Sequence, residues 1–163
     1  MGLVSKAVIG VVGVGLTAGA AAGLGGFDNT SRDDAGQIVQ EGNISVFSLQ
    51  VGDCLNIPDK NATKLGESSG VPCSQAHLYE VFAETTITDL TTYNKDAIST
   101  KASDFCSASF QTFVGIPVER STLTISWLVP TQETWGEGDN EITCILIRRD
   151  DLPMTMSMRG TGI

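Results

Sequence analysis

One stretch of the chain carries apolar side chains at the spacing of an α-helix. It lies between Asn94 and Val114, and charged residues occupy its other side. Its apolar and small positions recur every three or four residues: Ile98, Ala102, Phe105, Cys106, Ser109, Phe110 and Phe113. Asn94 suits the N-cap because its side chain can accept a hydrogen bond from a free N–H of the first turn. The pattern predicts one main helix whose phenylalanine-rich face packs on another apolar element.

Three β-prone runs predict the element on which this helix packs. Residues 78–87 alternate between two faces, as a strand does. Residues 123–129 and 141–147 are rich in β-branched residues, and a turn containing Gly, Asp and Asn at residues 136–140 separates them. We therefore expect an α+β fold, in which a small antiparallel sheet carries one main helix.

The remaining segments predict smaller elements. Residues 37–40 and 44–49 flank a short glycine-bearing loop, which favours a β-hairpin. Residues 56–70 are polar and rich in Lys, Ser and Gly, a composition typical of a surface loop. Met alternates with hydroxyl side chains at residues 154–158, which suggests a last edge strand, and we expect residues 160–163 to fray.

The N-terminal part has the pattern of an export segment. Residues 7–27 contain no charged side chain, and Lys6 stands just before them. Two interpretations stay open: a signal peptide cleaved after Ala20, or an uncleaved membrane anchor with Lys6 on the cytoplasmic side. The chain is accordingly divided into three parts: residues 1–27 as signal peptide or membrane anchor, residues 28–35 as a polar tether, and residues 36–163 as one extracytoplasmic domain.

The charge balance narrows the choice of partners. The chain has 10 Lys and Arg against 19 Asp and Glu, a formal net charge of −9 with His neutral. Such an excess of negative charge repels nucleic acid and anionic lipid headgroups, so we expect no nucleic-acid partner. A contact with the membrane is expected only through residues 7–27, if they remain uncleaved.

Four cysteines are expected to form two disulfides, because exported proteins meet an oxidising environment. Four cysteines allow three pairings, and spacing alone does not choose among them. Position favours Cys54 with Cys73, which would close the polar loop, and Cys106 with Cys144, which would tie the helix to the sheet. Each bridge would stabilise the fold by roughly 3 to 4 kcal/mol.

A zinc site is the competing interpretation of the first cysteine pair. Cys54, Cys73, His77 and Glu80 offer suitable ligand atoms. The chain has only one histidine, however, and lacks a CxxC or HxxxH pair. We expect neither a metal nor another cofactor.

His77 and Glu80 are the candidates for acid–base chemistry. A histidine close to a glutamate can act as a general base oriented by the carboxylate. No GxSxG elbow or other activated nucleophile accompanies them. We therefore favour a structural His77 that hydrogen-bonds to the backbone of the Cys54–Cys73 loop, and we expect no enzymatic activity.

Aromatic side chains are candidates for a binding face. Trp127, Trp135 and Tyr79 could stack on a glycan or peptide, although a Trp within a strand more often belongs to the core. The candidate functional surface comprises His77, Glu80, Trp135 and Asp139.

Several short motifs together resemble the actinobacterial septum-formation domain family. They are Val51-Gly52-Asp53-Cys54-Leu55, Val71-Pro72-Cys73-Ser74-Gln75-Ala76-His77 with Glu80-Val81, Cys106, Pro130-Thr131 with Trp135, Gly138-Asp139, Cys144, and Ser157-Met158-Arg159-Gly160-Thr161-Gly162. By matching position, the resemblance carries over Gly52, Asp53, Cys54, Pro72, Cys73, His77, Glu80, Cys106, Trp135, Gly138, Asp139 and Cys144. Asn140 is a departure, since the family often has Arg there.

The resemblance implies a membrane-tethered or secreted protein whose domain lies outside the cytoplasmic membrane. It also implies a part in septation without a defined activity. Together with the missing catalytic motifs, it predicts a non-catalytic envelope domain that contacts an envelope protein or cell-wall component. Two alternatives stay open: a small envelope enzyme using His77 and Glu80, and a secreted module that binds a ligand or protein.

Overall fold

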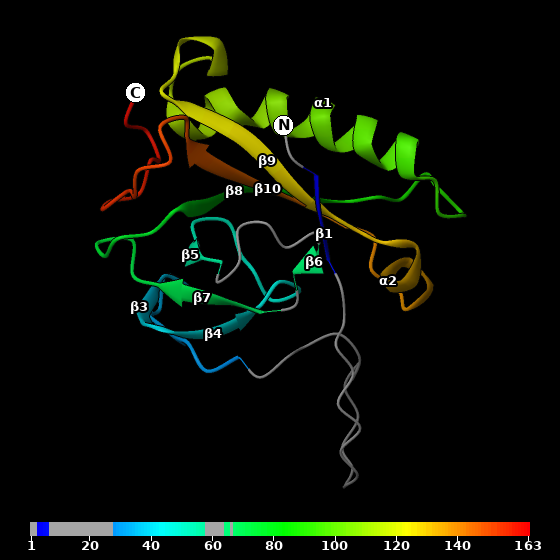
Figure 1. Ribbon diagram of the computed structural model, residues 1–163, viewed down its shortest axis with the longest axis horizontal. Coiled ribbons are helices and arrows are strands. Elements are labelled where there is room, and N and C mark those ends of the chain that lie inside the picture. Colours follow the sequence, from blue (N-terminus) through cyan, green and yellow to red (C-terminus); the bar gives the residue numbers. More distant parts are fainter. Residues whose placement is uncertain (1–2, 7–27, 58–63, 66) are drawn as a thin grey trace, which may run out of the picture.

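One long helix covers one face of a curved sheet (Figure 1). The structure, a computed structural model, describes residues 3–6, 28–57, 64–65 and 67–163. The helices are α1 Lys95–Val114 and α2 Gln132–Gly136, with a 3₁₀ turn, η1, at Val118–Arg120. The strands are β1 Leu3–Lys6, β2 Ser31–Arg32, β3 Ile38–Gln40, β4 Gly42–Ser45, β5 Cys54–Asn56, β6 Lys64–Leu65, β7 Glu67–Val71, β8 Tyr79–Thr86, β9 Leu123–Val129 and β10 Glu141–Arg148.

The sheet confirms the expected α+β class. Within the described residues its strand order is β4-β7-β5-β8-β10-β9-β1-β6. All pairs from β4 to β9 are antiparallel, whereas β1 pairs in parallel with β9 and β6 at one edge. β2 and β3 form a separate two-stranded sheet. The three predicted strands, β8, β10 and β9, are adjacent at the centre.

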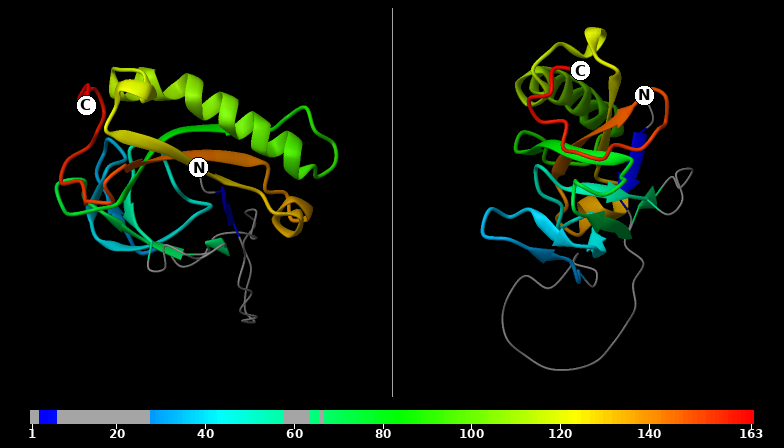
Figure 2. Two further views of the ribbon diagram at one scale, coloured as in Figure 1. Left: turned by 45° about the horizontal axis from the view of Figure 1, so that its top comes forward. Right: turned by 90° about the vertical axis from the view of Figure 1, so that its left-hand side faces the viewer.

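Helix α1 begins and ends as its sequence predicts. The Asn94 side chain accepts a hydrogen bond from the Ala97 N–H at 3.0 Å, and the helix ends at Gly115, whose φ of 103° suits glycine. Its buried face consists of Ile98, Ala102, Cys106, Phe110, Phe113 and Val114. This face packs on β8, β10 and β9, so the expected helix-on-sheet packing is confirmed (Figure 2).

The sheet buries apolar residues on its second face as well. The residues of this second core are Ile38, Ile44, Val46, Leu49, Leu55, Ile57, Val81, Leu128 and Ile145. β8 contributes to both cores, because Val81 faces the second core while the next residue, Phe82, packs under α1. The register of β8 and β10 shifts between Cys144 and Ile145, where Phe82 of β8 has no partner on β10 and lies in the same core as its neighbour Ala83. Two buried faces explain why the central strands are so apolar.

Both expected disulfides are present. Cys54 of β5 is bonded to Cys73, with Cα atoms 5.2 Å apart, and Cys106 of α1 is bonded to Cys144 of β10, with Cα atoms 5.5 Å apart. The second bond therefore ties the helix to the sheet, as its position along the helical stripe predicts.

Two sequence predictions for the N-terminal half are wrong. Strand β3 pairs with β2, and β4 pairs with β7, so no hairpin joins residues 37–40 to 44–49. Residues 56–70 are not only a surface loop, because they contain β6 and most of β7. The side chain of Ser68 is buried, and a Cβ added to Gly70 would lie 2.8 Å from Cδ1 of Ile38. Position 70 therefore accepts only glycine without a shift of its neighbours, and β7 has little apolar character for the sequence analysis to recognise.

The C-terminal predictions are also corrected. Residues 154–158 form no strand beyond a single bridge between Met154 and His77. Residues 160–162 do not fray, because the N–H groups of Gly160 and Gly162 each donate at 2.8 Å to carbonyls at the end of α1. The segment lies across the C-terminal end of the helix, which places Arg159 beside it.

The N-terminal expectations are tested only in part. Of residues 1–27, expected as signal peptide or membrane anchor, the structure describes residues 3–6, which form β1, whereas residues 7–27 lie outside the described residues. In the part of the chain that the structure describes, no helix has the length and apolar character needed to span a membrane. Residues 28–35, expected as a polar tether, include β2 and make contacts with the domain through Asn29 and Arg32.

Candidate functional site

The four residues of the predicted functional surface do not come together. His77 and Glu80 lie where β8 begins, beside the first disulfide. Trp135 and Asp139 lie in α2 and the turn before β10, at the opposite end of the central strands (Figure 1). Each pair has contacts within the fold that explain its position.

The His77 side chain is fully buried and contacts the backbone of a neighbouring residue. Its Nδ1 lies 2.8 Å from the Gln75 carbonyl oxygen, and its main chain exchanges two hydrogen bonds with Met154, at 2.9 and 2.7 Å. Burial lowers the pKa of the imidazole, since desolvation disfavours its charged form. The residue therefore links the segment after Cys73 to the C-terminal segment.

Glu80 is also buried, and it fastens the C-terminal segment to β8. Ser157 Oγ donates to Oε1 at 2.5 Å, and the Met158 N–H donates to Oε2 at 2.7 Å. Burial raises the pKa of this carboxyl group, and the two hydrogen bonds partly offset that effect. Both carboxylate oxygens therefore accept hydrogen bonds from the C-terminal segment.

The first disulfide lies among the residues that were considered as zinc ligands. One side-chain atom each of Cys54, Cys73 and Glu80 lies within 4.8 Å of the others, a spacing that could suit a metal ion. The two sulfurs are bonded to each other, however, and zinc requires thiolates. The disulfide explains why these atoms are close.

Trp135 and Asp139 stabilise the turn that leads into β10. Asp139 is buried, and its carboxylate accepts hydrogen bonds from Thr134 Oγ1 at 3.0 Å and from the Glu141 N–H at 3.3 Å. Trp135 is half-buried and packs edge-on against Tyr93, with ring centroids 6.4 Å apart. Trp127 lies in the core under α1.

Asp53, another residue of the family motif, makes a buried ion pair. Arg32 of β2 donates to both carboxylate oxygens, at 2.5 and 2.8 Å, and the Gln50 N–H donates to one of them at 2.8 Å. The Asp53 side chain is only 1% exposed, so it has lost its hydration. The pair joins the N-terminal segment to the turn before Cys54.

We expect Arg32→Ala to lower the free energy of unfolding by about 1 to 2 kcal/mol, because it leaves Asp53 buried without its cation. Urea unfolding of the full chain measures the change. Arg120→Ala removes an exposed arginine and should stay within about 0.5 kcal/mol of the wild type. Equal stability of the two variants would show that the Arg32–Asp53 pair contributes nothing.

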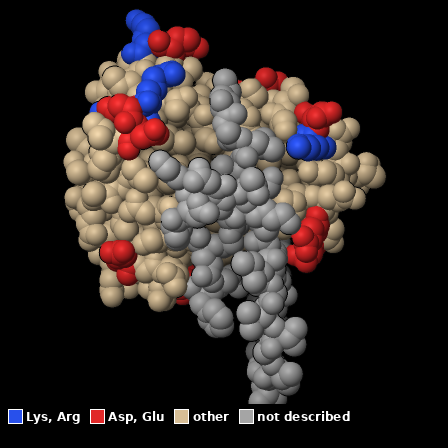
Figure 3. Space-filling model, in the orientation of Figure 1, with Lys and Arg blue, Asp and Glu red and all other residues tan. Residues whose placement is uncertain are grey.

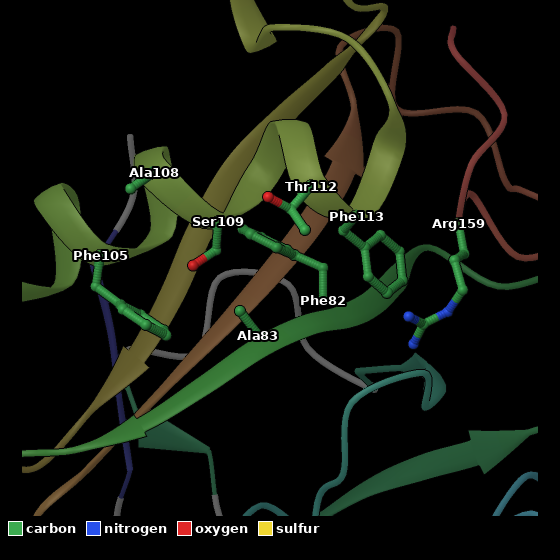
Figure 4. A pocket seen from close by; sticks show the side chains of 8 residues that line it. All are labelled: Phe82, Ala83, Phe105, Ala108, Ser109, Thr112, Phe113 and Arg159. Carbon is green, nitrogen blue, oxygen red and sulfur yellow. The ribbon is translucent and has the colours of Figure 1, made fainter.

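A groove between α1 and β8 is the best candidate site in the described structure (Figure 4). Its volume is about 430 Å³, within the ~300–1,000 Å³ of typical ligand pockets. It is lined by Phe82, Ala83, Phe105, Ala108, Ser109, Thr112, Phe113 and Arg159. The lining is mostly apolar, and Arg159 is its one charged side chain.

The spacing of residues along α1 explains the groove. Ala108, Ser109 and Thr112 are small and lie between Phe105 and Phe113, so the flank of the helix is hollow between two large rings. On the sheet side, the Phe82 ring is drawn inward by contacts with Phe110 and Phe113, at centroid distances of 5.8 and 6.1 Å. The groove is therefore built from two rigid elements.

Arg159 occupies one end of this groove beside Phe113 (Figure 4). Its Cζ lies 4.3 Å from the centroid of the Phe113 ring, a cation–π contact that orients the guanidinium. No hydrogen bond or ion pair joins this guanidinium to another residue in the described ranges. Other cations behave differently: Lys101 and Arg148 are each paired with an aspartate, and basic groups lie beside acidic ones on the face shown in Figure 3.

No pattern in the sequence points to the groove or to Arg159 as a functional residue. Arg159 belongs to the motif at residues 157–162, but nothing in that motif indicates that it crosses the end of α1. The available signal was the run of small residues between two phenylalanines on a predicted helix. This run indicates a depression on one side of the helix, but it does not identify the residues of β8 that form the opposite wall.

The comparisons with known proteins give one match. The family described as septum formation matches residues 28–144, a range that includes all four cysteines as well as His77 and Glu80. No curated protein and no solved structure matched the chain. The matched range spans most of the described fold and confirms the resemblance of the motifs between Val51 and Cys144, whereas the motif at residues 157–162 lies outside it. The chain therefore belongs to the septum formation family.

Proposed function

We propose that this protein is a non-catalytic interaction domain in septum formation, and that the α1–β8 groove contacts an envelope protein or cell-wall component. The observation that carries the proposal is an open apolar groove whose one cation, Arg159, has no hydrogen-bonded partner in the described structure. Exposed apolar concavities of this kind mark binding sites. His77 and Glu80 do not support the enzyme alternative, because both side chains are buried and the two Glu80 oxygens accept hydrogen bonds from Ser157 and Met158.

The proposed place of action is the outer face of the cytoplasmic membrane. The two disulfides indicate an oxidising compartment outside the cytoplasm. Residues 7–27 would either anchor the protein there or be removed after Ala20 to release it. N-terminal sequencing of the mature protein distinguishes these two forms, because only cleavage yields a new terminus at Ala21.

A crosslinking experiment tests the groove in growing cells. A photoreactive residue replaces the exposed Ala108 in the full chain, and crosslinked partners are identified by mass spectrometry. We expect Thr112→Trp to abolish these crosslinks and to reduce recruitment of the protein to septa, because the indole fills the groove. Gln111→Trp is the matched control, since Gln111 is exposed on the same helix but does not line the groove. Identical crosslinks in both variants would contradict the proposal.

A further inference from the structure

The only histidine of the chain has one ring nitrogen that the fold does not use. Its Nδ1 lies 2.8 Å from the Gln75 carbonyl oxygen, which is an acceptor, so the proton of the neutral His77 ring lies on Nδ1. Nε2 therefore carries a lone pair. This atom is buried and has no hydrogen-bond partner among the described residues. A buried polar atom in this situation requires an explanation, and an ion is one of the explanations.

The bond from Nδ1 is also the arrangement found in metal-binding histidines. Such histidines donate the N–H of one ring nitrogen to a backbone carbonyl or a carboxylate, which fixes the ring and directs the lone pair of the other nitrogen at the metal. Burial lowers the pKa of the His77 imidazole, so the ring stays neutral near neutral pH, as coordination requires. The imidazole is thus in the right orientation and protonation state to act as a ligand.

The residue opposite His77 supplies a second donor atom. His77 and Met154 form an antiparallel bridge, and each N–H donates to the carbonyl oxygen of the other, at 2.9 and 2.7 Å. Side chains of directly opposed residues lie on the same face, with Cβ atoms about 5.5 Å apart in a hydrogen-bonded pair. Met154 is only 2% exposed, so its thioether is buried on the same face as the imidazole. The backbone pairing therefore places a soft sulfur beside Nε2.

We propose that His77 and Met154 bind copper(I), with Nε2 of the imidazole and Sδ of the thioether as the two protein ligands. Thioether sulfur selects copper(I) among the common metal ions, and imidazole is a second ligand that copper accepts. The site lies outside the α1–β8 groove, because neither residue lines the groove. It also differs from the zinc site considered in the sequence analysis, since it uses no cysteine.

A buried water molecule explains the unpaired Nε2 less well than a cation does. Such a water makes about three hydrogen bonds, and a thioether is only a weak acceptor. Trp127 Nε1 and Thr143 Oγ1 are also buried without a hydrogen-bond partner in the part of the chain that the structure describes. They lie beside the other half of β8, where Thr143 pairs with Glu84, so they do not complete a water network at His77. Copper(I) is satisfied by a few soft donors.

The surrounding chemistry disfavours zinc at this position. Zinc takes four ligands, chosen from thiolates, imidazoles and carboxylates. All four cysteines are in disulfides, and both oxygens of Glu80 accept hydrogen bonds from Ser157 and Met158. A thioether does not form a disulfide, so it remains available as a ligand in an oxidising compartment. The site is therefore expected to be selective for a soft, monovalent ion.

The ion reaches the site through a short opening of the bridge. The bridge between His77 and Met154 is isolated from the strands, and the neighbouring residues Ala76 and Thr155 are exposed. Segments with few packed contacts and exposed backbone open at a low cost in free energy. Entry therefore does not require unfolding of either core.

Competition for copper(I) tests the site in the full, disulfide-bonded chain. The probe is copper(I) held by bicinchoninate and kept reduced by ascorbate under anaerobic conditions. We expect the protein to withdraw one ion per chain, measured as a loss of the absorbance of the chelate, and excess zinc should not reverse this transfer. Silver(I) serves as an air-stable substitute in NMR spectra of the methionine ε-methyl groups. It should shift the signal of Met154 more than those of Met156 and Met158.

Protein variants assign the effect to the two ligands. Met154→Leu removes the sulfur at nearly constant volume, so it should keep the fold and weaken the affinity for copper(I) at least about tenfold. His77→Asn keeps an N–H donor for the Gln75 carbonyl but has no Nε2, so it should abolish binding. Met158→Leu is the matched control, because Met158 is a buried methionine of the same segment that does not bridge to His77. This control should bind copper(I) as the wild type does, and circular dichroism confirms that each variant is folded.

Several results would overturn the inference. These are a wild type that takes no copper(I) from the chelate, a folded Met154→Leu variant that binds as tightly as the wild type, or displacement of copper(I) by zinc. Equal weakening in Met154→Leu and Met158→Leu would likewise contradict it, because the loss would then come from packing. The proposed function does not depend on these results, since the crosslinks from position 108 test the groove separately.

Discussion

Replacing Cys106 and Cys144 together by alanine is expected to lower the free energy of unfolding by about 4 kcal/mol. The bond closes a loop of 38 residues, and removing it gives the unfolded chain the corresponding conformational freedom. Both cysteines are fully buried between α1 and β10, so the substitution also removes packed sulfur atoms. A loss of this size is a large part of the ~5 to 15 kcal/mol that stabilises a typical domain. Urea unfolding of the full chain measures it.

The first disulfide provides a comparison. Cys54 and Cys73 are separated by 19 residues, and the same relation gives a loss of about 3 kcal/mol for their double alanine variant. Ser107→Ala, an exposed change beside Cys106, should alter stability by less than about 0.5 kcal/mol. If removal of the second disulfide costs no more than this control, the helix is held on the sheet by packing alone.

Removal of the Cys106–Cys144 bond is also expected to affect the α1–β8 groove. Helix α1 forms one wall of the groove, and its covalent bond is to β10, the strand next to β8. Without that bond, the spacing between α1 and β8 depends only on side-chain contacts such as Phe82 with Phe110. We therefore expect weaker binding in the groove even at temperatures where the variant stays folded.

Local patterns explain which parts of the fold could be predicted. Helix α1 and strands β8, β9 and β10 bury long apolar stripes, so their periodicity is visible in the sequence. The pattern of strand β7 is weak in the sequence, because two of its buried positions are Ser68 and Gly70, and only Val71 at its end carries a hydrophobic signal. The pairing of β4 with β7 could not be predicted either, because the pairing of strands that are distant in the sequence depends on how the complete sheet packs.

The site was harder to predict, because residue type does not determine a residue's partners. His77 and Glu80 were chosen as groups able to transfer protons, yet the carboxylate of Glu80 is occupied by Ser157, which is 77 residues away in the chain. Arg159 reaches the groove only because the C-terminal segment crosses the end of α1. Contacts of this kind depend on tertiary packing, and no spacing in the sequence records them.

Glu80→Ala is expected to lower the free energy of unfolding by about 3 kcal/mol. It leaves the Met158 N–H and the Ser157 hydroxyl without their acceptor, and each unsatisfied buried group costs about 1 to 3 kcal/mol. It also releases the segment that positions Arg159, so binding of the proposed partner in the α1–β8 groove should weaken. Glu80→Gln keeps a side-chain oxygen for Met158 and should retain most of the stability. Equal losses in the two variants would show that the volume of the side chain matters and its hydrogen bonds do not.

The pH dependence of the free energy of unfolding distinguishes the effect of the charge of Glu80 from the effect of its side-chain volume. Burial raises the pKa of Glu80 in the folded protein above its ordinary value near 4.5, so the folded state holds a proton that the unfolded state has released. The resulting stabilisation is fully present below about pH 4.5 and is lost as the pH rises through the folded-state pKa. Glutamine does not titrate, so the stability of the wild type relative to Glu80→Gln should fall across this range. Taking this difference cancels the other carboxyl groups, which both proteins share. A difference that stays constant or rises with pH would mean that burial does not favour the protonated form of Glu80, and that its hydrogen bonds to Ser157 and Met158 outweigh the cost of desolvation.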